Sequence, residues 1–525
     1  MFRSVLKLLT LVTLAVRAQN PAIPAAYDQP YRPQVHFSPH HNWTNDPNGL
    51  VYFEGEYHLF FQYNPFGDRW GHMSWGHAVS RDLVHWQELP VALPEENGVM
   101  IFTGSTVVDN NNTSGFCTGG KPCLVAIYTG HTPKIDTHPA LQTQNLAYSN
   151  DRGRTWTKFT GNPVLNLNLP DFRDPGVFWS AQGKRWVMAV ALPRDRRVRF
   201  YGSPDLKHWD LLSEFGPAGA TGGVWECPTL FEAPVEGENG GTRWVLKVGL
   251  NPGALQGGSG EQYFVGRFDG TRFVNENPDS QTLWTDYGKD CYCALTFNGL
   301  AKSDKPVMLG WMNNWQYANQ VPTSPWRGQM TAPRQLALRK YREGLRLVQQ
   351  PVVRHSESKQ KHLRLSDQTG KEINQALRNN PIVREPFEIR ATLSLGAADE
   401  IGWKLLGSDG TATTVGYDKK RQELFVDRAH SGVVDFSPYF PTRTAVPLPA
   451  SDSLELDILV DRSSVEVFAQ QGRVAITNLV FPLGVSQTVE FYSRAAEAGP
   501  IAVDLWNLDS IWATGGRLKP VTNSR

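Results

Sequence analysis

A short internal repeat is the feature that most constrains the fold of this chain. The segment Ser80–Trp86 returns as Ser203–Trp209 with the pattern Ser-x-Asp-Leu-x-His-Trp kept, and a looser version runs from Ser149 to Trp156. From about residue 36 to about residue 350, short apolar strand-like stretches alternate with tight turns. Repeats of roughly 50 to 70 residues that each hold about four strands are typical of β-propeller blades. Roughly 310 residues at that period predict about five blades.

The whole chain is predicted to be all-β, a five-bladed β-propeller followed by a C-terminal β-sandwich. After a polar and basic stretch at Arg354–Lys361, alternating strand patterns such as Leu454–Val460 suit a sandwich with one buried face per sheet. No catalytic grouping stands out in this second half. The expected divisions are a signal peptide at 1–18, an N-terminal extension at 19–35, the propeller at 36–350, a linker at 351–370 and the sandwich at 371–525.

Three carboxylates stand beside or near a proline at the start of strand-like stretches, in Asn45-Asp46-Pro47, Arg173-Asp174-Pro175 and Glu226-Cys227-Pro228. Equivalent positions on the innermost strands of a propeller face its central channel, so the three acids are expected to converge there. An Asp-Pro pair by itself often marks only a turn. Three such segments in register favour a common site.

Hydrolysis of a glycosidic bond needs a general acid for the leaving oxygen and a second carboxylate that attacks the anomeric carbon or activates water. Asp46, Asp174 and Glu226 could supply both and leave one acid to hold sugar hydroxyls. Carboxylates held close together repel, so the pKa of one of them should rise. Arg173 should favour the charged form of Asp174. Spacing alone does not assign the roles.

The N-terminus has the pattern of a secretory signal. Arg3 and Lys7 precede a nearly all-apolar run from Leu8 to Val16, and Val16-Arg17-Ala18 has the small-residue spacing of a cleavage site. This run is too short to span a bilayer, and no later segment is long enough. The formal net charge of +1, without a basic stripe, gives no support for nucleic-acid binding. We expect a secreted, extracellular protein that binds neither membrane nor nucleic acid.

The five cysteines fit an oxidising compartment. Cys117 and Cys123 flank a glycine-rich loop and could close it with a disulfide. Cys291 and Cys293 share one face of a strand, and such neighbours seldom pair with each other. The odd count leaves at least one free thiol or one intermolecular bridge. Without a matching histidine cluster, these cysteines do not indicate a metal site.

Sequons for N-glycosylation occur at Asn42, Asn111 and Asn112. The overlapping pair at Asn111 and Asn112 lies in a polar loop and is the expected glycan site. Asn42 precedes Asp46 by four residues, and a glycan there would block the proposed pocket, so we expect Asn42 to be unmodified.

Further motifs surround the three acids in a fixed order along the chain. They are Trp43–Gly49 (WTNDPNG), Phe60–Pro65 (FFQYNP), Phe102–Ser105 (FTGS), Phe172–Pro175 (FRDP), Trp225–Pro228 (WECP), Gly310–Trp315 (GWMNNW), Asp427–Gly432 (DRAHSG) and Asp461–Phe468 (DRSSVEVF). The set resembles glycoside hydrolase family 32, the β-fructofuranosidases, and within it the secreted fungal exo-inulinases and invertases. The resemblance covers nearly the whole mature chain.

The resemblance implies a five-bladed propeller with a β-sandwich and a role for each acid. Asp46 would be the nucleophile that forms a fructosyl-enzyme intermediate, and Glu226 the general acid and then the base. Asp174, with Arg173, would hold fructose hydroxyls and stabilise the transition state. The Asp46 and Glu226 carboxyls should lie about 5 to 5.5 Å apart, as in retaining enzymes. No metal or cofactor is implied. The implied substrate-binding residues are Asn45, Gln62, Trp70, Phe102, Thr103, Ser105, Arg173 and Trp315.

Three positions depart from the usual pattern of that family. Thr44 stands where members usually carry Met, and Thr103 where they usually carry Ser. Cys291-Tyr292-Cys293 replaces a segment that is commonly Phe-Tyr-Ala. None of these changes removes a catalytic acid, so they bear on substrate preference and on the tendency to transfer fructose.

The expected activity is exo-acting release of terminal β-D-fructofuranosyl residues from sucrose, inulin-type fructans and fructo-oligosaccharides, with transfer to sugars at high sucrose. One alternative is an enzyme that is predominantly a fructosyltransferase. Others are an inverting propeller glycosidase, such as an arabinan-cleaving enzyme, and a non-catalytic sugar-binding propeller. The complete set of acids and the motif around Asp46 argue against the last two. The partners are fructose-containing saccharides, and the protein is expected to be a monomer or a homodimer.

Overall fold

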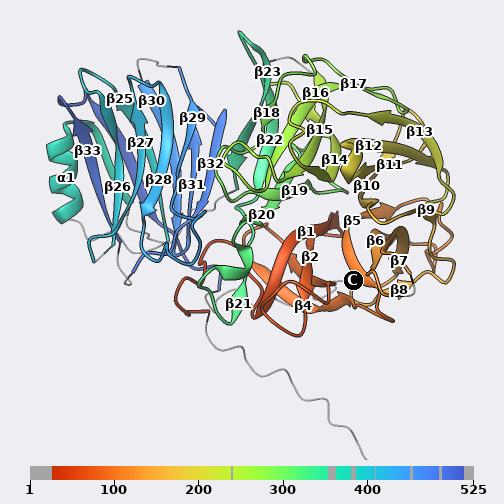
Figure 1. The fold of residues 1–525 in the computed structure, drawn as a ribbon. Coiled ribbons are helices and arrows are strands. Elements are labelled where there is room, and N and C mark those ends of the chain that lie inside the picture. The colour runs from red at the N-terminus through yellow and green to blue at the C-terminus, as the bar shows by residue number, and fades with distance from the viewer. Residues whose placement is uncertain are drawn as a thin grey trace, which may run out of the picture.

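The computed structural model describes residues 27–136, 138–237, 241–352, 362–379, 386–407, 409–449, 453–483 and 487–512. The predicted signal peptide lies outside the described residues, as do residues 353–361 of the expected linker. The regular secondary structure of the described part is almost wholly β-strand, in two domains, and the predicted all-β fold of a propeller followed by a sandwich is confirmed (Figure 1). None of its helices is long and apolar enough to cross a membrane.

Five sheets of mainly antiparallel strands make up the propeller, and the first long strand of each is innermost. The first holds β1 (Asn42–Phe53), β2 (Glu56–Asn64), β3 (Ser74–Ser80) and β4 (Trp86–Leu93), with β21 (Trp326–Arg327) parallel to β1. The second holds β5 (Met100–Asp109), β6 (Cys123–Thr132) and β7 (Leu141–Ser149), with β8 (Thr157–Lys158) and β9 (Leu165–Leu169) both pairing β7. The third holds β10 (Arg173–Ser180), β11 (Arg185–Leu192), β12 (Arg197–Ser203) and β13 (Asp210–Phe215).

The remaining two sheets complete the circle. The fourth holds β14 (Val224–Pro234), β15 (Thr242–Asn251) and β16 (Gly260–Phe268), with β17 (Phe273–Asn275) and β18 (Leu283–Trp284) both pairing β16. The fifth holds β19 (Tyr292–Thr296), β20 (Val307–Trp311), β22 (Arg334–Tyr341) and β23 (Gly344–Pro351). Two short 3-10 helices, η1 (Pro193–Asp195) and η2 (Ala318–Gln320), lie in connections. β1, β5, β10, β14 and β19 contact one another in this order, and β19 contacts β1, so the innermost strands form a ring.

The sequence repeat builds the same turn between the third and fourth strands of two sheets. Asp82 Oδ1 accepts hydrogen bonds from the amides of Val84 and His85, and the indole of Trp86 donates to the carbonyl of Leu83. Residues 203–209 make the corresponding contacts between β12 and β13. The looser copy at 149–156 forms a related turn between β7 and β8, with its own indole-to-carbonyl bond. The repeat therefore marks the outer turns of the sheets, while the channel residues lie on other strands.

The second domain packs two sheets face to face over one apolar core. One sheet holds β24 (His362–Gln368), β34 (Ile501–Asn507), β25 (Phe387–Ser394), β30 (Ser453–Asp461), β31 (Ser464–Ala469) and β32 (Val474–Leu479). The other holds β29 (Arg443–Pro447), β28 (Glu423–His430), β27 (Ala412–Asp418), β26 (Glu400–Gly407) and β33 (Gln487–Arg494). The helix α1 (Gly370–Asn379) packs against β33 at the outer end of the domain (Figure 1).

The expected linker at 351–370 contains a strand. β24 pairs with β34, and its Leu363 and Leu365 pack against the sandwich core. In this strand two leucines alternate with exposed polar side chains, which is the pattern of an edge strand. The preceding residues are polar and basic, so the whole range was interpreted as a linker. The second domain therefore begins inside the range that was expected to be a linker.

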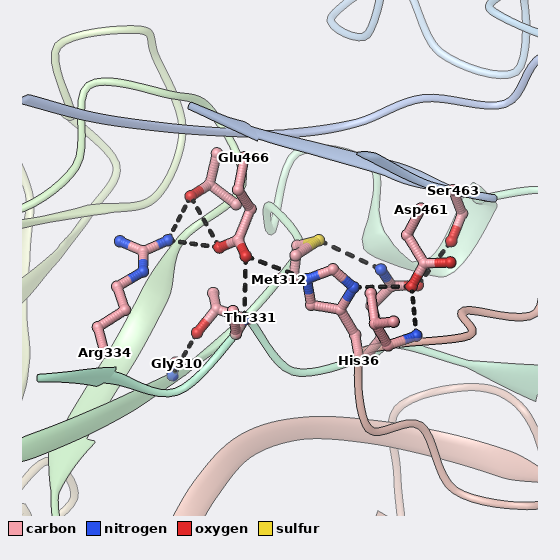
Figure 2. A network of polar contacts seen from close by, with 12 residues as sticks. His36, Gly310, Met312, Thr331, Arg334, Asp461, Ser463 and Glu466 are labelled. Carbon is pink, nitrogen blue, oxygen red and sulfur yellow. Dashed lines mark hydrogen bonds and ion pairs between the residues drawn. The ribbon is translucent and has the colours of Figure 1, made fainter. Parts of the chain in front are cut away.

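A buried network of charged side chains joins the two domains (Figure 2). His36, just after the N-terminal extension, lies 2.8 Å from Asp461 and 3.0 Å from Glu466, both on the sandwich side. Arg334 on β22 pairs with Glu466 at 2.6 Å and with Asp286 at 2.9 Å. Burial alone would lower the pKa of His36, but the hydrogen bonds to Asp461 and Glu466 raise it to about 9. His36 is therefore a cation at neutral pH.

A second buried contact between the domains lies close to the channel. Arg428 on β28 pairs with Asp290 at 2.5 Å and donates a hydrogen bond to the hydroxyl of Tyr317 at 2.8 Å. Asp290 stands two residues before Tyr292 at the start of β19. The sandwich thus holds the beginning of one innermost strand of the propeller.

Candidate active site

The five innermost strands share one irregularity, a break in pairing register where the strand passes the channel. The breaks lie between Thr44 and Pro47 in β1, Ile101 and Gly104 in β5, Arg173 and Gly176 in β10, Glu226 and Thr229 in β14, and Tyr292 and Leu295 in β19. Such bulges bend a strand and re-aim its side chains. Each of the three acids lies within or at the edge of such a break.

The prolines that follow the acids fit this local geometry. Proline has no amide hydrogen, so within a sheet it is tolerated at bulges and edges. Pro47 lies at the end of the break in β1, while Pro175 and Pro228 lie inside the breaks of β10 and β14. Asp174 and Cys227 adopt left-handed backbone conformations, with φ of 66° and 50°. The acid-proline segments of the sequence are therefore bulges rather than simple turns.

An open pocket of about 380 Å³ lies at the bulges of β1, β5, β10 and β14. All three acids line it, as do seven of the eight residues expected to bind substrate. The lining comprises Asn45, Asp46, Gln62, Trp70, Phe102, Thr103, His131, Gln142, Asp171, Arg173, Asp174, Glu226 and Trp315. The convergence expected from the sequence is thus present in the fold.

Ser105 is the exception among the expected substrate-binding residues. Its hydroxyl donates to the carbonyl of Pro175 at 2.8 Å and accepts from the amide of Val177 at 2.9 Å. It lines a smaller inner cavity of about 30 Å³ rather than the open pocket. These contacts tie β5 to β10 and leave Ser105 behind the pocket wall.

Asp46 is buried and receives two hydrogen bonds. The amide of Asn45 donates to Oδ1 at 3.0 Å and the hydroxyl of Thr103 donates to Oδ2 at 2.6 Å. Burial raises the pKa of Asp46 to about 6, because the two hydrogen bonds offset only part of the desolvation and Glu226 adds repulsion. Asp46 is therefore ionised at neutral pH and takes up a proton in mildly acidic solution.

Asp174 lies deeper against the neighbouring strand. Its Oδ2 accepts from the amide of Cys227 at 2.9 Å, and its own amide donates to the hydroxyl of Thr129 at 3.0 Å. Burial raises the pKa of Asp174 to about 7, although the charge of Arg173 opposes this shift. Arg173 favours the charged form, as expected from the sequence, but its effect is smaller than that of burial.

Glu226 is held from two sides. Arg173 donates to Oε1 from Nε at 3.1 Å and from Nη2 at 2.9 Å, and the hydroxyl of Tyr292 donates to Oε2. Arg173 is in turn fixed by Asp171 at 2.8 Å and by Gln142 at 3.2 Å. Burial would lower the pKa of Arg173, but Glu226 and Asp174 raise it well above its ordinary value, so the guanidinium stays charged.

Aromatic rings form much of the remaining wall. Trp315 lies beside Trp43, with ring centroids 6.0 Å apart and planes at 28°. Phe102 stacks on the imidazole of His131 at 4.5 Å, and Trp70 meets Phe102 edge-on. Flat apolar faces of this kind pack well against sugar rings.

Four residues at the site were missed by sequence reasoning. Gln142 on β7 and Asp171 before β10 position Arg173, His131 on β6 stacks in the pocket, and Tyr292 on β19 bonds Glu226. Gln142 and His131 lie on strands outside the innermost ring. Their positions in the sequence therefore do not repeat in step with the three acids, and no motif points to them. The sequence marks Tyr292 only as the middle residue of Cys291-Tyr292-Cys293, the segment that departs from the usual family pattern.

The cysteines pair in one expected and one unexpected way. The Cys117–Cys123 disulfide is present, and a second joins Cys227 to Cys293, leaving Cys291 free and buried. Asp46, Cys227 and Cys293 bring their ligand atoms within 4.8 Å of one another. The two bonded sulfurs offer no thiolate, so this group lacks the donors of a metal site.

The sequon residues Asn111 and Asn112 are exposed in the loop after β5. The side-chain oxygen of Asn112 accepts a hydrogen bond from the amide of Cys117 at 2.9 Å. Asn42 is half-buried at the start of β1. Glycan occupancy at the loop, and the expected absence of a glycan at Asn42, stay predictions.

Both domains match known family models. Residues 36–351 match "Glycosyl hydrolases family 32 N-terminal domain", and residues 352–507 match "Glycosyl hydrolases family 32 C terminal". A levanase of Bacillus subtilis is 47% identical over 520 residues, which cover 96% of this chain and 74% of the relative. An extracellular exo-inulinase of Aspergillus niger is 44% identical over 523 residues, covering 93% of this chain and 96% of the relative. The crystal structure of an exo-inulinase from Aspergillus awamori superposes with a TM-score of 0.84 at 41% identity, covering 93% of this chain and 100% of that one.

Proposed function

The chain belongs to glycoside hydrolase family 32 and is a glycosidase, and from this we propose that it is a secreted exo-acting β-fructosidase. Its substrates are sucrose, inulin-type fructans and fructo-oligosaccharides, from which it releases terminal β-D-fructofuranosyl residues with retention of configuration. The observation that carries this proposal is the meeting of Asp46, Asp174 and Glu226 in one pocket of about 380 Å³. Relatives described as levanase and as extracellular exo-inulinase support the substrate class and the secretion.

In the first step, Asp46 attacks the anomeric carbon of fructose while Glu226 gives its proton to the departing glycosidic oxygen. The bond to the leaving sugar breaks, and an ester between fructose and Asp46 forms. In the second step, Glu226 takes a proton from water, whose oxygen attacks the same carbon and releases Asp46 as a carboxylate. Asp174 accepts hydrogen bonds from fructose hydroxyls throughout.

The contacts of Glu226 add a requirement to this scheme. In the free enzyme its two oxygens accept from Arg173 and Tyr292, so both oxygens already have hydrogen-bond donors. The incoming sugar must therefore draw Arg173 away or supply hydroxyls that compete for it, so that Glu226 can reach the departing oxygen. Such a change on substrate binding would couple recognition of fructose to activation of the acid.

The test measures initial release of fructose and glucose from sucrose, inulin and levan by the wild type. Asp46→Asn removes the nucleophile with little change of volume. Asp269→Asn serves as the matched control, because Asp269 is exposed in the turn between β16 and β17 and does not line the pocket. Fructose release that Asp46→Asn abolishes and Asp269→Asn keeps is the expected result. Absence of fructose from all three substrates would overturn the proposal.

Fructosyl transfer is the second candidate activity, because the fructosyl-enzyme can be attacked by a sugar hydroxyl instead of water. The pocket lining includes two aromatic side chains in edge-on contact, Trp70 and Phe102, on which an acceptor sugar can pack. We expect fructo-oligosaccharides in concentrated sucrose, at a rate below that of hydrolysis. A rate of transfer that exceeds hydrolysis in dilute sucrose would instead identify a fructosyltransferase.

A further inference from the structure

The disulfide between Cys227 and Cys293 joins two strands that have no backbone ladder between them. β14 and β19 are each the end strand of a different sheet, so their hydrogen-bonding partners lie outward, on β15 and β20. The two cysteines have Cα atoms 5.4 Å apart and are almost fully buried. This covalent bond is therefore a direct link between neighbouring sheets at the channel.

Both cysteines sit in the bulges that shape the site. Cys227 and Cys293 have φ of 50° and 46°, the left-handed region that a residue with a side chain rarely adopts. Each directly follows a residue of the site, Glu226 in β14 and Tyr292 in β19. Since the hydroxyl of Tyr292 donates to Glu226, the disulfide spans the two bulges next to that hydrogen bond.

The same disulfide touches the third strand of the site. The Cys227 sulfur lies 3.7 Å from Asp46 Oδ2, the oxygen that also accepts from Thr103. A bonded sulfur has no hydrogen to donate, so this contact does not stabilise the charge on the oxygen as a hydrogen bond would. A free Cys227 thiol in that place could donate to the carboxylate, and two thiols would need more room than a bonded pair.

We infer that the Cys227–Cys293 disulfide is a positioning element of the active site, which fixes Glu226 against Tyr292 and keeps a thiol hydrogen away from Asp46. This inference rests on the proposed function for the roles of Asp46 and Glu226. Cys293 stands where the family resemblance implies a common Ala.

The titratable groups that face Asp46 come from three other strands. They are Glu226 on β14, Asp174 on β10 and Tyr292 on β19. The disulfide neither carries nor loses charge, so it changes the ionisation of Asp46 only through contact and position. A thiol donor toward Oδ2 would favour the carboxylate and lower the pKa of Asp46.

The test compares three variants with the wild type. Cys293→Ala leaves the Cys227 thiol beside Asp46, the double variant Cys227→Ala/Cys293→Ala removes both sulfurs, and Cys117→Ser/Cys123→Ser removes the other disulfide, whose loop lies away from the pocket. We expect Cys293→Ala to lower kcat about fivefold or more, to leave KM within about twofold, and to move the acid limb of kcat/KM to lower pH by about half a unit. The double variant should lose kcat without that pH shift, and the control pair should match the wild type.

Counting thiols in denaturant without reductant provides a readout that needs no activity. The wild type should show one reactive thiol, from Cys291, and Cys293→Ala should show two. Three thiols in the wild type would overturn the inference, as would wild-type kcat and pH profile in Cys293→Ala. If Cys293→Ala does not fold, Cys293→Ser is measured in its place. Absence of fructose release by the wild type would instead contradict the proposed function, and the thiol count would still decide whether the crosslink exists.

Discussion

At the scale of single residues, the ionisation of the site depends on a balance. Burial raises the pKa of a carboxyl group, while hydrogen bonds and nearby cations lower it. Asp46 and Asp174 are both buried, and in both the pKa rises although hydrogen bonds or a cation oppose the shift. In the proposed mechanism, the raised pKa makes the ionised Asp46 more basic and therefore more reactive toward the anomeric carbon. The cost is that the charged form of each carboxylate is held in a buried place that disfavours charge.

The hydroxyl of Thr103 should tune the acid limb of activity. It donates to Asp46 at 2.6 Å and opposes the rise in the pKa of that carboxyl. Thr103→Val keeps the shape and removes the donor, so the pKa of Asp46 should rise further and the acid limb of kcat/KM should move up by about one pH unit. Thr103→Ser keeps the donor and should leave the limb in place. Equal profiles for the two variants would contradict the assignment.

The charge of Asp46 should also cost stability. Its pKa in the folded state, about 6, lies above the ordinary value of 3.8, so its favourable contribution is fully present below pH 3.8 and lost as the pH rises through about 6. Asp46→Asn should therefore be more stable than the wild type at pH 7, with a free energy of unfolding higher by about 3 kcal/mol. The hydroxyl of Thr103 can rotate to accept from the new amide.

Melting curves of the two proteins from about pH 4 to about pH 7 measure this difference. The gap in melting temperature should open between those values and vanish at the acidic end. A gap that is the same at every pH would show that packing, and not the carboxylate charge, separates the two proteins.

At the scale of elements, the propeller places its acids through bulges on closely packed inner strands. A Cβ atom on Gly176 in β10 would lie 2.6 Å from the carbonyl oxygen of Pro228 in β14, a contact with rigid backbone. β10 and β14 can approach this closely only with glycine at that position. This approach lets the Cys227 amide reach Asp174.

Gly176→Ala should push these two strands apart. We expect a loss of about 1 to 3 kcal/mol in the free energy of unfolding, typical of overpacking, and a fall in kcat as Asp174 and Glu226 separate. Gly67→Ala is the matched control, because a Cβ atom there meets nothing within 4 Å and no positive φ is required. Chemical denaturation and initial rates measure both effects, and equal stability of the two variants would refute the close approach.

At the scale of the whole molecule, the sandwich holds the propeller through buried charges. His36, Arg334, Asp461 and Glu466 lie at the junction and are fully buried (Figure 2). Burial would raise the pKa of Glu466, but Arg334 and His36 lower it to about 2. Removing one member of such a group leaves the others charged without a partner, which costs several kcal/mol.

His36 should make the joined domains sensitive to alkaline pH. Its pKa in the folded state, about 9, lies above the ordinary value of 6.5, so its stabilising effect is fully present below pH 6.5 and lost as the pH rises through about 9. Over that pH interval, the free energy of unfolding of the wild type should fall by on the order of 3 kcal/mol more than that of His36→Gln. Thermal unfolding at several pH values measures the difference. Parallel pH dependence in the two proteins would exclude a charged His36.

The repeat, the apolar alternation and the acid-proline segments were enough to predict the all-β fold, the order of propeller and sandwich and the meeting of three acids. Each of these follows from local pattern, because strand period, turn chemistry and blade repetition are written along the chain. The predicted range of the linker was wrong in part because it contains β24, a short strand that is half polar. This strand forms by pairing with β34, near the other end of the second domain's sequence.

The contacts that shape the site come from residues distant in sequence. Cys227 meets Cys293, Tyr292 meets Glu226 and Gln142 meets Arg173 only after the inner strands close into a ring. Burial, which sets the pKa values of Asp46 and Asp174, is a property of that closed ring and not of any segment. The sequence by itself therefore determined which groups are present and which strands carry them. The tertiary structure alone decided their partners and their ionisation, because distance and desolvation arise only when the sheets pack.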